Sequence, residues 1–94
     1  MRSPQKGRAF YNYGVALLRE DRVRDATRAF ETAAGLDGDD DFSYAALAYC
    51  AELEQEWEKA LNLYQRALQM NPQNEYAVRG YARLKQFESL EMEQ

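Results

Sequence analysis

The sequence predicts an all-α chain, built from two helical hairpins followed by a fifth helix. Apolar and small residues recur at spacings of three and four residues, which is typical of half-buried helices. The same order of large and small residues also recurs at an offset of 34 residues, with Phe10, Tyr44 and Val78 in equivalent places. A period of this length indicates stacked copies of one helix-turn-helix unit.

The repeated unit is clearest over residues 41–74. Its marker positions are Tyr44, Leu47, Ala48, Ala60, Tyr64, Ala67 and Pro72. The preceding unit has Phe10, Tyr13, Gly14, Ala26, Phe30 and Ala33 in the equivalent places, and the fifth helix has Val78, Tyr81 and Ala82. In each hairpin a small residue, Gly14 or Ala48, is expected to face another, Ala26 or Ala60, so that the paired helices approach closely.

On these residues the chain resembles the tetratricopeptide repeat family over about residues 7–94. The second unit matches best, through residues 57–61, 64–68 and 71–74. The departures from the family pattern are Ala48 for glycine, Ala51 and Leu17 for the later aromatic residue, and Gly38 for the first proline. The resemblance implies one domain, a right-handed α-solenoid. Its expected parts are a flexible lead-in (1–6), two repeats (7–40 and 41–74), and a capping helix with a frayed tail (75–94).

Local signals place the helices within these units. The expected helices cover about residues 8–20, 22–36, 41 onward, 57–70, and 75 to beyond 87, with fraying from residue 89. Pro4 would fit an earlier start of the first helix, because proline is favoured at the first helical position. Asp21 and Asn74 are the expected N-caps of the second and fifth helices. Lys85 stands where the first helix has Leu17, which suits the water-facing side of a terminal helix.

Composition excludes several classes of function. The net charge of −4 and the pI near 4.8 disfavour nucleic acid and anionic membranes as main partners. The longest apolar run, residues 44–51, has eight residues, far below the roughly 18 of a membrane-spanning helix. No signal peptide is visible, so a cytoplasmic location is expected. The chain has one cysteine and no histidine, so Cys50 is expected to pack as a small apolar residue.

Two acidic stretches are the only candidates for metal or acid–base chemistry. Asp37, Asp39 and Asp41 alternate as calcium ligands do, but Phe42 and Ala48 stand where an EF-hand loop needs glycine and glutamate. The run is therefore interpreted as a turn with acids at the start of a helix. The second stretch, Glu52, Glu54, Glu56 and Glu58, is interpreted as a solvated edge. The chain is predicted to be non-enzymatic, with no metal and no cofactor.

The family resemblance implies a concave groove lined by the first helix of each unit. Transferred by spacing, the groove residues are Arg8, Tyr11, Asn12, Val15 and Arg19, then Phe42, Ala45, Ala46, Tyr49 and Leu53, then Tyr76, Arg79, Gly80 and Arg83. Tyrosine and arginine are enriched at binding hot spots. The expected function is therefore a protein-interaction module that binds a peptide or helical segment with acidic and apolar residues. Arg8, Arg79 and Arg83 would pair with its acids.

One binding mode of the family is disfavoured. Its members that hold the C-terminal carboxylate of chaperones use a clamp of lysine, asparagine and arginine side chains. The clamp positions fall on Tyr11, Val15, Ala46, Tyr76 and Gly80, and none of these residues matches the clamp. A chaperone tail is therefore not expected to bind by that mechanism.

The alternative function is self-association. Repeat arrays expose an unfinished apolar face at each end, and two full units are fewer than the three that usually suffice. The fifth helix carries Leu84, Phe87, Leu90 and Met92 near its end, and these residues would contact a second copy. The groove surface is the other expected contact in such homo-oligomers.

Overall fold

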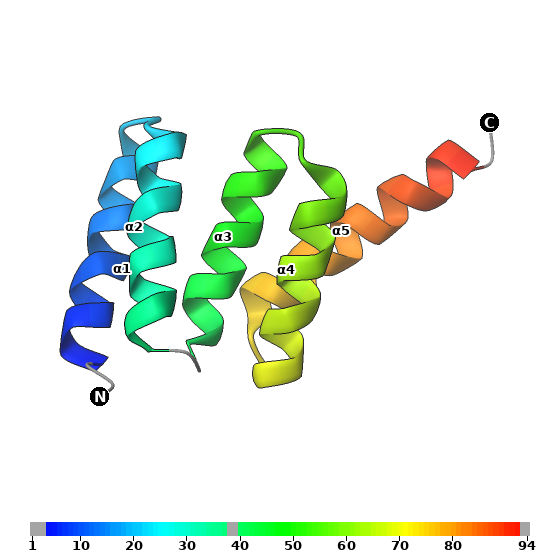
Figure 1. Ribbon diagram of the computed structural model, residues 1–94. Helices are drawn as coiled ribbons and strands as arrows, with labels where there is room; N and C mark the ends of the chain where they lie inside the picture. The colour runs from blue at the N-terminus through cyan, green and yellow to red at the C-terminus, as the bar shows by residue number, and fades with distance from the viewer. Residues whose placement is uncertain (1–3, 38–39, 93–94) are drawn as a thin grey trace.

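The computed structural model describes residues 4–37 and 40–92, and within them it contains five α-helices and no strand. The helices are α1 (Pro4–Arg19), α2 (Val23–Leu36), α3 (Asp41–Leu53), α4 (Trp57–Met70) and α5 (Glu75–Met92). The first four stand side by side in chain order, each antiparallel to the one before, and α5 packs on α4 and continues beyond it (Figure 1). The prediction of an all-α solenoid of two hairpins and a fifth helix is confirmed.

The helix bounds agree closely with the sequence pattern in the middle of the chain and less well at its ends. Helix α1 begins at Pro4, the earlier of the two expected starts, so the second half of the expected lead-in is helical. Helix α5 continues to Met92, past Ser89, where fraying was expected. Residues 1–3 and 93–94 of these two segments lie outside the described residues. None of the described helices is both long and apolar enough to cross a membrane.

The corner between α1 and α2 differs from its prediction. Asp21 has a left-handed backbone (φ 63°), and its N–H donates to the Leu18 carbonyl at 2.9 Å. The next N–H, of Arg22, donates to the Leu17 carbonyl at 2.9 Å. These two bonds form a Schellman motif, so Asp21 ends α1. The prediction that Asp21 caps α2 is wrong, because Arg22 takes the N-cap position there and its side chain makes no capping hydrogen bond.

The corner between α3 and α4 repeats this geometry one unit later. Gln55 has a φ of 64°, and its N–H donates to the Glu52 carbonyl at 3.0 Å. The Glu56 N–H donates to the Ala51 carbonyl at 2.8 Å. Both corners therefore place a residue other than glycine in the conformation that a Schellman motif requires.

The turns between hairpins also repeat. Asp40 accepts a hydrogen bond from the Ser43 N–H at 3.1 Å, and Asn74 accepts one from the Ala77 N–H at 3.0 Å, so each caps the helix that follows it. The Asp41 carboxylate accepts from the Asn74 side-chain amide at 2.8 Å and links the two turns. The expected cap at Asn74 is confirmed. In the 36–41 run, Asp40 and Asp41 lie at the start of α3 and Asp37 ends α2, whereas Asp39 lies outside the described residues. No group of three or more possible metal ligands occurs among the described residues.

The core contains two large buried aromatic rings, and each packs against a glycine. Phe30 of α2 and Tyr64 of α4 are fully buried. A Cβ added at Gly14 would lie 2.6 Å from the Phe30 ring, and one added at Gly80 would lie 2.2 Å from the Tyr64 ring. Gly14 therefore makes room for a ring of the paired helix.

Cys50 lies on the buried side of α3, within the core that the first hairpin forms with α3. Its side chain is buried, and burial raises the pKa of the thiol above its ordinary value. A buried thiol that is disfavoured as a thiolate packs as an apolar residue. The prediction for Cys50 is confirmed.

Candidate binding groove

The side of the molecule formed by α1, α3 and α5 contains an apolar hollow of about 380 Å³. Small residues on α3, Ala45 and Ala46, leave room for it, and the rings of Phe30 and Tyr64 reach it from the second helix of each hairpin. Its remaining lining residues are Tyr11, Val15, Leu18, Phe42, Tyr49, Tyr76, Arg79 and Arg83. The hollow therefore spans all three helices that begin a unit.

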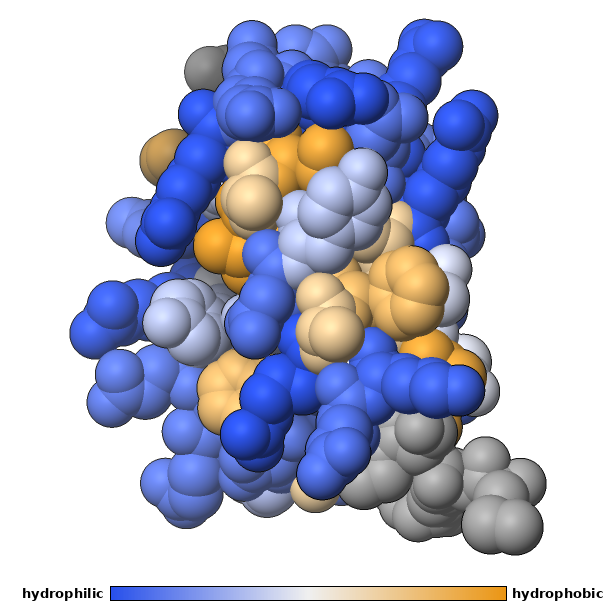
Figure 2. Space-filling model, turned by 90° about the vertical axis from the view of Figure 1, so that its left-hand side faces the viewer, coloured by the Kyte–Doolittle hydropathy of each residue, from blue (hydrophilic) through white to orange (hydrophobic). Residues whose placement is uncertain are grey.

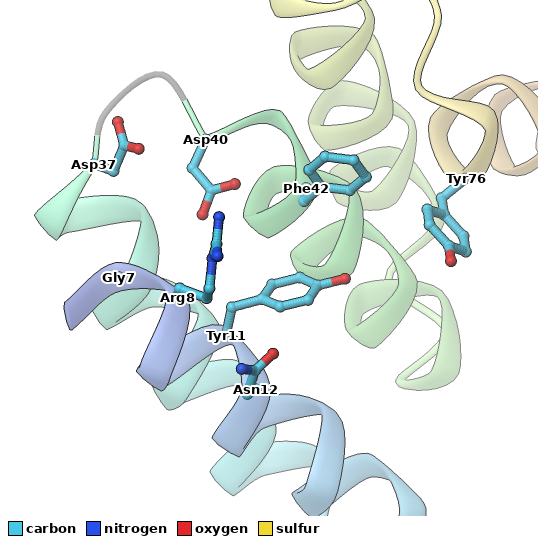
Figure 3. A pocket seen from close by; sticks show the side chains of 8 residues that line it. All are labelled: Gly7, Arg8, Tyr11, Asn12, Asp37, Asp40, Phe42 and Tyr76. Atoms are coloured by element: carbon cyan, nitrogen blue, oxygen red, sulfur yellow. The ribbon is translucent and has the colours of Figure 1, made fainter. Parts of the chain in front are cut away.

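A row of three aromatic rings, Tyr11, Phe42 and Tyr76, crosses the opening of this hollow. Phe42 lies 6.4 Å from Tyr11 and 6.4 Å from Tyr76 between ring centroids, both at 69°. This is the edge-to-face arrangement that aromatic pairs prefer. One ring comes from each of α1, α3 and α5 (Figure 3). Phe42 is 46% exposed and Tyr76 is 65% exposed, so both rings are accessible to a ligand.

A second hollow, of about 410 Å³, lies on the other side of this aromatic row. It is lined by the same three rings and by Gly7, Arg8, Asn12, Asp37 and Asp40. The Arg8 side chain extends toward Asp40 (Figure 3). Burial, together with the nearby Tyr76 and Asp40, raises the pKa of Tyr11, so its hydroxyl stays protonated at neutral pH and can donate a hydrogen bond. The groove thus has an apolar half and a polar half.

The predicted groove residues divide between these two hollows, with three exceptions. Those lining the apolar hollow are Tyr11, Val15, Phe42, Ala45, Ala46, Tyr49, Tyr76, Arg79 and Arg83, and those of the polar hollow include Arg8 and Asn12. Leu53 lies instead in a depression beside residues 21–25. Arg19 lines neither hollow of the groove, and Gly80 is buried under the Tyr64 ring. Leu18, Phe30 and Tyr64 also line the groove, although they were not predicted there. For Phe30 and Tyr64 the sequence pattern indicated only that they pack in the core.

Arg83 is bound by a carboxylate of the protein itself. Its Nε donates to Glu52 Oε2 at 2.8 Å, and its Nη2 donates to Glu52 Oε1 at 2.8 Å. The hydroxyl of Tyr64 donates to the same Oε1 at 2.9 Å. Burial opposes ionisation of Glu52, but the bonds from Arg83 and Tyr64 outweigh it and lower the pKa of this carboxyl. One ionised carboxylate of α3 therefore ties α4 and α5 together.

This network corrects the interpretation of the acidic stretch in the second unit. Glu54, Glu56 and Glu58 are exposed, as expected for a solvated edge. Glu52 is not part of that edge, because its side chain is only 15% exposed and both oxygens accept hydrogen bonds. The four glutamates alternate regularly along the chain, so the sequence alone did not distinguish the partly buried Glu52 from its exposed neighbours.

Arg79 has a much weaker partner than Arg83. Its Nη2 lies 3.7 Å from Glu75 Oε2, one turn away on α5, and both side chains are mostly exposed. Exposed pairs of this kind contribute between zero and about 1 kcal/mol. Of the two arginines that line the apolar hollow, Arg79 is therefore the one that a ligand can engage at little cost.

Comparison with known proteins agrees with this architecture. The sequence model of the tetratricopeptide repeat family matches residues 42–74, inside the expected second unit. A comparison with curated protein sequences found no match. Among solved structures, the tetratricopeptide domain of OM64 from Arabidopsis superposes with a TM-score of 0.80 at 21% identity, covering 86% of this chain and 67% of that one.

A second similar structure is the second tetratricopeptide domain of human RPAP3, solved in complex with the HSP70 peptide SGPTIEEVD. It superposes with a TM-score of 0.79 at 20% identity, over 85% of this chain and 67% of that one. At these identities the likeness concerns the fold alone, a stack of helical hairpins with an extended concave surface. Residues 42–74 thus match one tetratricopeptide repeat in sequence, and most of the chain has the fold of the two solved tetratricopeptide domains.

Proposed function

We propose that the protein binds a peptide or helical segment of a partner protein in the groove between α1, α3 and α5, without catalysing a reaction. The aromatic row of Tyr11, Phe42 and Tyr76 at the opening of the apolar hollow carries this proposal. Accessible rings in a concave site provide large contact areas at a low cost in side-chain entropy. The peptide bound to the human RPAP3 domain supports a peptide as the kind of ligand.

The proposed ligand has an apolar residue beside an acidic one. The apolar side chain would enter the hollow above Ala45 and Ala46, where small side chains leave space. The acidic residue would meet Arg79, whose pairing with Glu75 is weak. Arg8 extends toward Asp40 in the polar hollow, so we expect it to pair with the ligand less than Arg79 does.

The proposed binding mode differs from the carboxylate clamp that holds chaperone tails in this family. The five clamp positions carry Tyr11, Val15, Ala46, Tyr76 and Gly80, which offer no lysine, asparagine or arginine. Four of them line the apolar hollow and the fifth lies under the Tyr64 ring. The ligand would therefore be held mainly by ring and methyl contacts along its length, and not by its terminal carboxylate.

A phage-displayed library of random peptides tests the groove. Peptides selected on the wild-type protein should carry an apolar residue, and Phe42→Ala should weaken them about thirtyfold, the effect of losing a hot-spot side chain worth about 2 kcal/mol. Trp57→Ala is the matched control, because Trp57 is 45% exposed, as Phe42 nearly is, but packs on Phe87 away from both hollows. Isothermal titration measures the affinities. Wild-type affinity in the Phe42→Ala protein would exclude the groove as the binding site.

Self-association is a second candidate function, favoured by the two ends of the solenoid. At the α1–α2 end, Phe10 and Tyr13 are exposed beside a shallow hollow that Arg22 and Arg28 also line. Figure 2 shows apolar side chains gathered on this end of the molecule. At the other end, Phe87 of α5 is exposed. A second copy would cover both faces in a head-to-tail contact.

Charge complementarity supports the head-to-tail arrangement. Residues 1–36 contain seven basic and four acidic side chains, whereas residues 37–94 contain five basic and twelve acidic ones. The first hairpin is thus net positive and the rest of the chain net negative. Head-to-tail contacts are heterologous and extend into rings or filaments, so association would not stop at a dimer.

Sedimentation velocity over a range of protein concentrations tests this second candidate. The wild-type protein should associate at low salt and dissociate at high salt. Arg24→Glu with Arg28→Glu, and separately Glu58→Lys with Glu88→Lys, should each associate more weakly than wild type, since each reduces the charge difference between the first hairpin and the rest of the chain. An equimolar mixture of the two variants should associate again. A wild-type protein that stays monomeric at high concentration and low salt would exclude self-association.

A further inference from the structure

Arg83 is a cation that faces the groove, and Glu52 of the protein itself already binds it. Arg83 lines the apolar hollow and its side chain is 52% exposed, yet Nε and Nη2 both donate to Glu52 at 2.8 Å. This two-point contact is the geometry in which arginine usually binds a carboxylate of a ligand. Glu52 therefore stands where an acidic side chain of a partner would otherwise bind Arg83.

Glu52 is held in this place from the interior. The Tyr64 hydroxyl donates to Oε1 at 2.9 Å, and the Tyr64 ring is 2% exposed and packs against the backbone of Gly80. If Glu52 turned away, the buried hydroxyl would lose its partner, at a cost of about 1–3 kcal/mol. A ligand carboxylate that competes for Arg83 must overcome this cost.

The first hairpin has no counterpart of this network. One unit earlier, the places of Glu52, Tyr64 and Arg83 are taken by Leu18, Phe30 and Tyr49, which also line the hollow. The hollow is thus apolar on the side of the first unit, and on the side of the second unit it contains a charge pair that is already satisfied. The repeat pattern alone does not require such a pair at this position.

We propose that Glu52 determines the charge preference of the groove, by serving as an internal carboxylate that withholds Arg83 from ligands. This inference rests on the proposed binding function. Arg79 and Arg83 are one helical turn apart, so a segment with two acids spaced to meet them would gain from only one of them. The groove accordingly selects apolar segments with a single acid and discriminates against more acidic ones.

The same peptide library, selected in parallel on wild type, Glu52→Gln and Glu54→Gln, tests this proposal. Glutamine keeps the length of the side chain and an oxygen that can accept from Tyr64. Glu52→Gln should enrich peptides with a second acidic residue, and these should bind it about tenfold more tightly than they bind wild type, equal to about 1.4 kcal/mol. Glu54→Gln removes the same charge from an exposed site nearby and should leave the selection unchanged. Adding Arg83→Gln to Glu52→Gln should abolish the gain.

A measurement that needs no peptide separates this proposal from the proposed function. Sodium acetate is titrated into isotopically labelled protein, and the Nε–Hε NMR signals of Arg79 and Arg83 are followed. The Arg79 signal should move in wild type and in Glu52→Gln, whereas the Arg83 signal should move only in Glu52→Gln. An Arg83 signal that responds in wild type as strongly as Arg79, or equal acid enrichment by Glu52→Gln and Glu54→Gln, would overturn the role of Glu52. Peptide binding that is unchanged by Phe42→Ala would instead count against the groove itself.

Discussion

Tyr64→Ala is expected to lower the free energy of unfolding by about 3–5 kcal/mol, the range for removing a fully buried aromatic side chain. The Tyr64 ring fills the space between α4 and the backbone of Gly80 on α5, so its loss leaves a cavity at the joint between the second hairpin and the last helix. It also removes a hydrogen bond to Glu52. Urea denaturation followed by circular dichroism measures the effect.

Tyr64→Phe is the matched control for this variant. It keeps the ring and removes only the hydroxyl, and Glu52 keeps both bonds from Arg83. The expected loss is about 1 kcal/mol, the net contribution of one hydrogen bond. If Tyr64→Phe were as unstable as Tyr64→Ala, the hydrogen-bond network and not ring packing would hold α5 in place.

Gly80→Ala is expected to destabilise the protein although alanine favours helices. The exchange gains about 1 kcal/mol in helix propensity in an unobstructed helix. At this site the new Cβ would lie 2.2 Å from the Tyr64 ring, and relieving such overpacking typically costs about 1–3 kcal/mol or more. Gly14→Ala should behave alike, because its Cβ would lie 2.6 Å from the Phe30 ring. Thermal and urea unfolding of both variants measure the net effect.

Gly35→Ala provides the control, since it makes the same exchange in α2 with no neighbouring atom within 4 Å. It should raise stability by up to about 1 kcal/mol. A second variant, Gly80→Ala with Tyr64→Leu, should recover part of the stability lost by Gly80→Ala, because the smaller side chain frees the space. A Gly80→Ala protein as stable as Gly35→Ala would contradict the packing of Tyr64 on this glycine.

The helices could be predicted from the sequence because their signals are local. Apolar spacing and the residues flanking each run gave both bounds of α4 and the end of α2, and Asn74 was identified as a cap from its chemistry and place. The corner at Asp21 was missed for an equally local reason. The usual signal for a Schellman motif is glycine or asparagine, and here aspartate and glutamine take that position.

The groove could be predicted only in part. Helical spacing identifies which side chains share a face, so the aromatic row and Arg79 were found. It does not say which of them meet side chains of another helix. The pairing of Arg83 with Glu52 joins α5 to α3 and depends on how the two helices cross. Arg19 and Leu53, the last residues of α1 and α3, line neither hollow, although helical spacing places them on the groove face.

The Schellman corners at Asp21 and Gln55 determine which face of the second helix in each hairpin turns toward the core. In both, only three residues separate the end of one helix from the start of the next. Each residue inserted or deleted there would turn the following helix by about 100° about its axis unless the corner refolded. The buried stripe of that helix would then face water, so these corners, unlike most surface loops, should not tolerate changes in length.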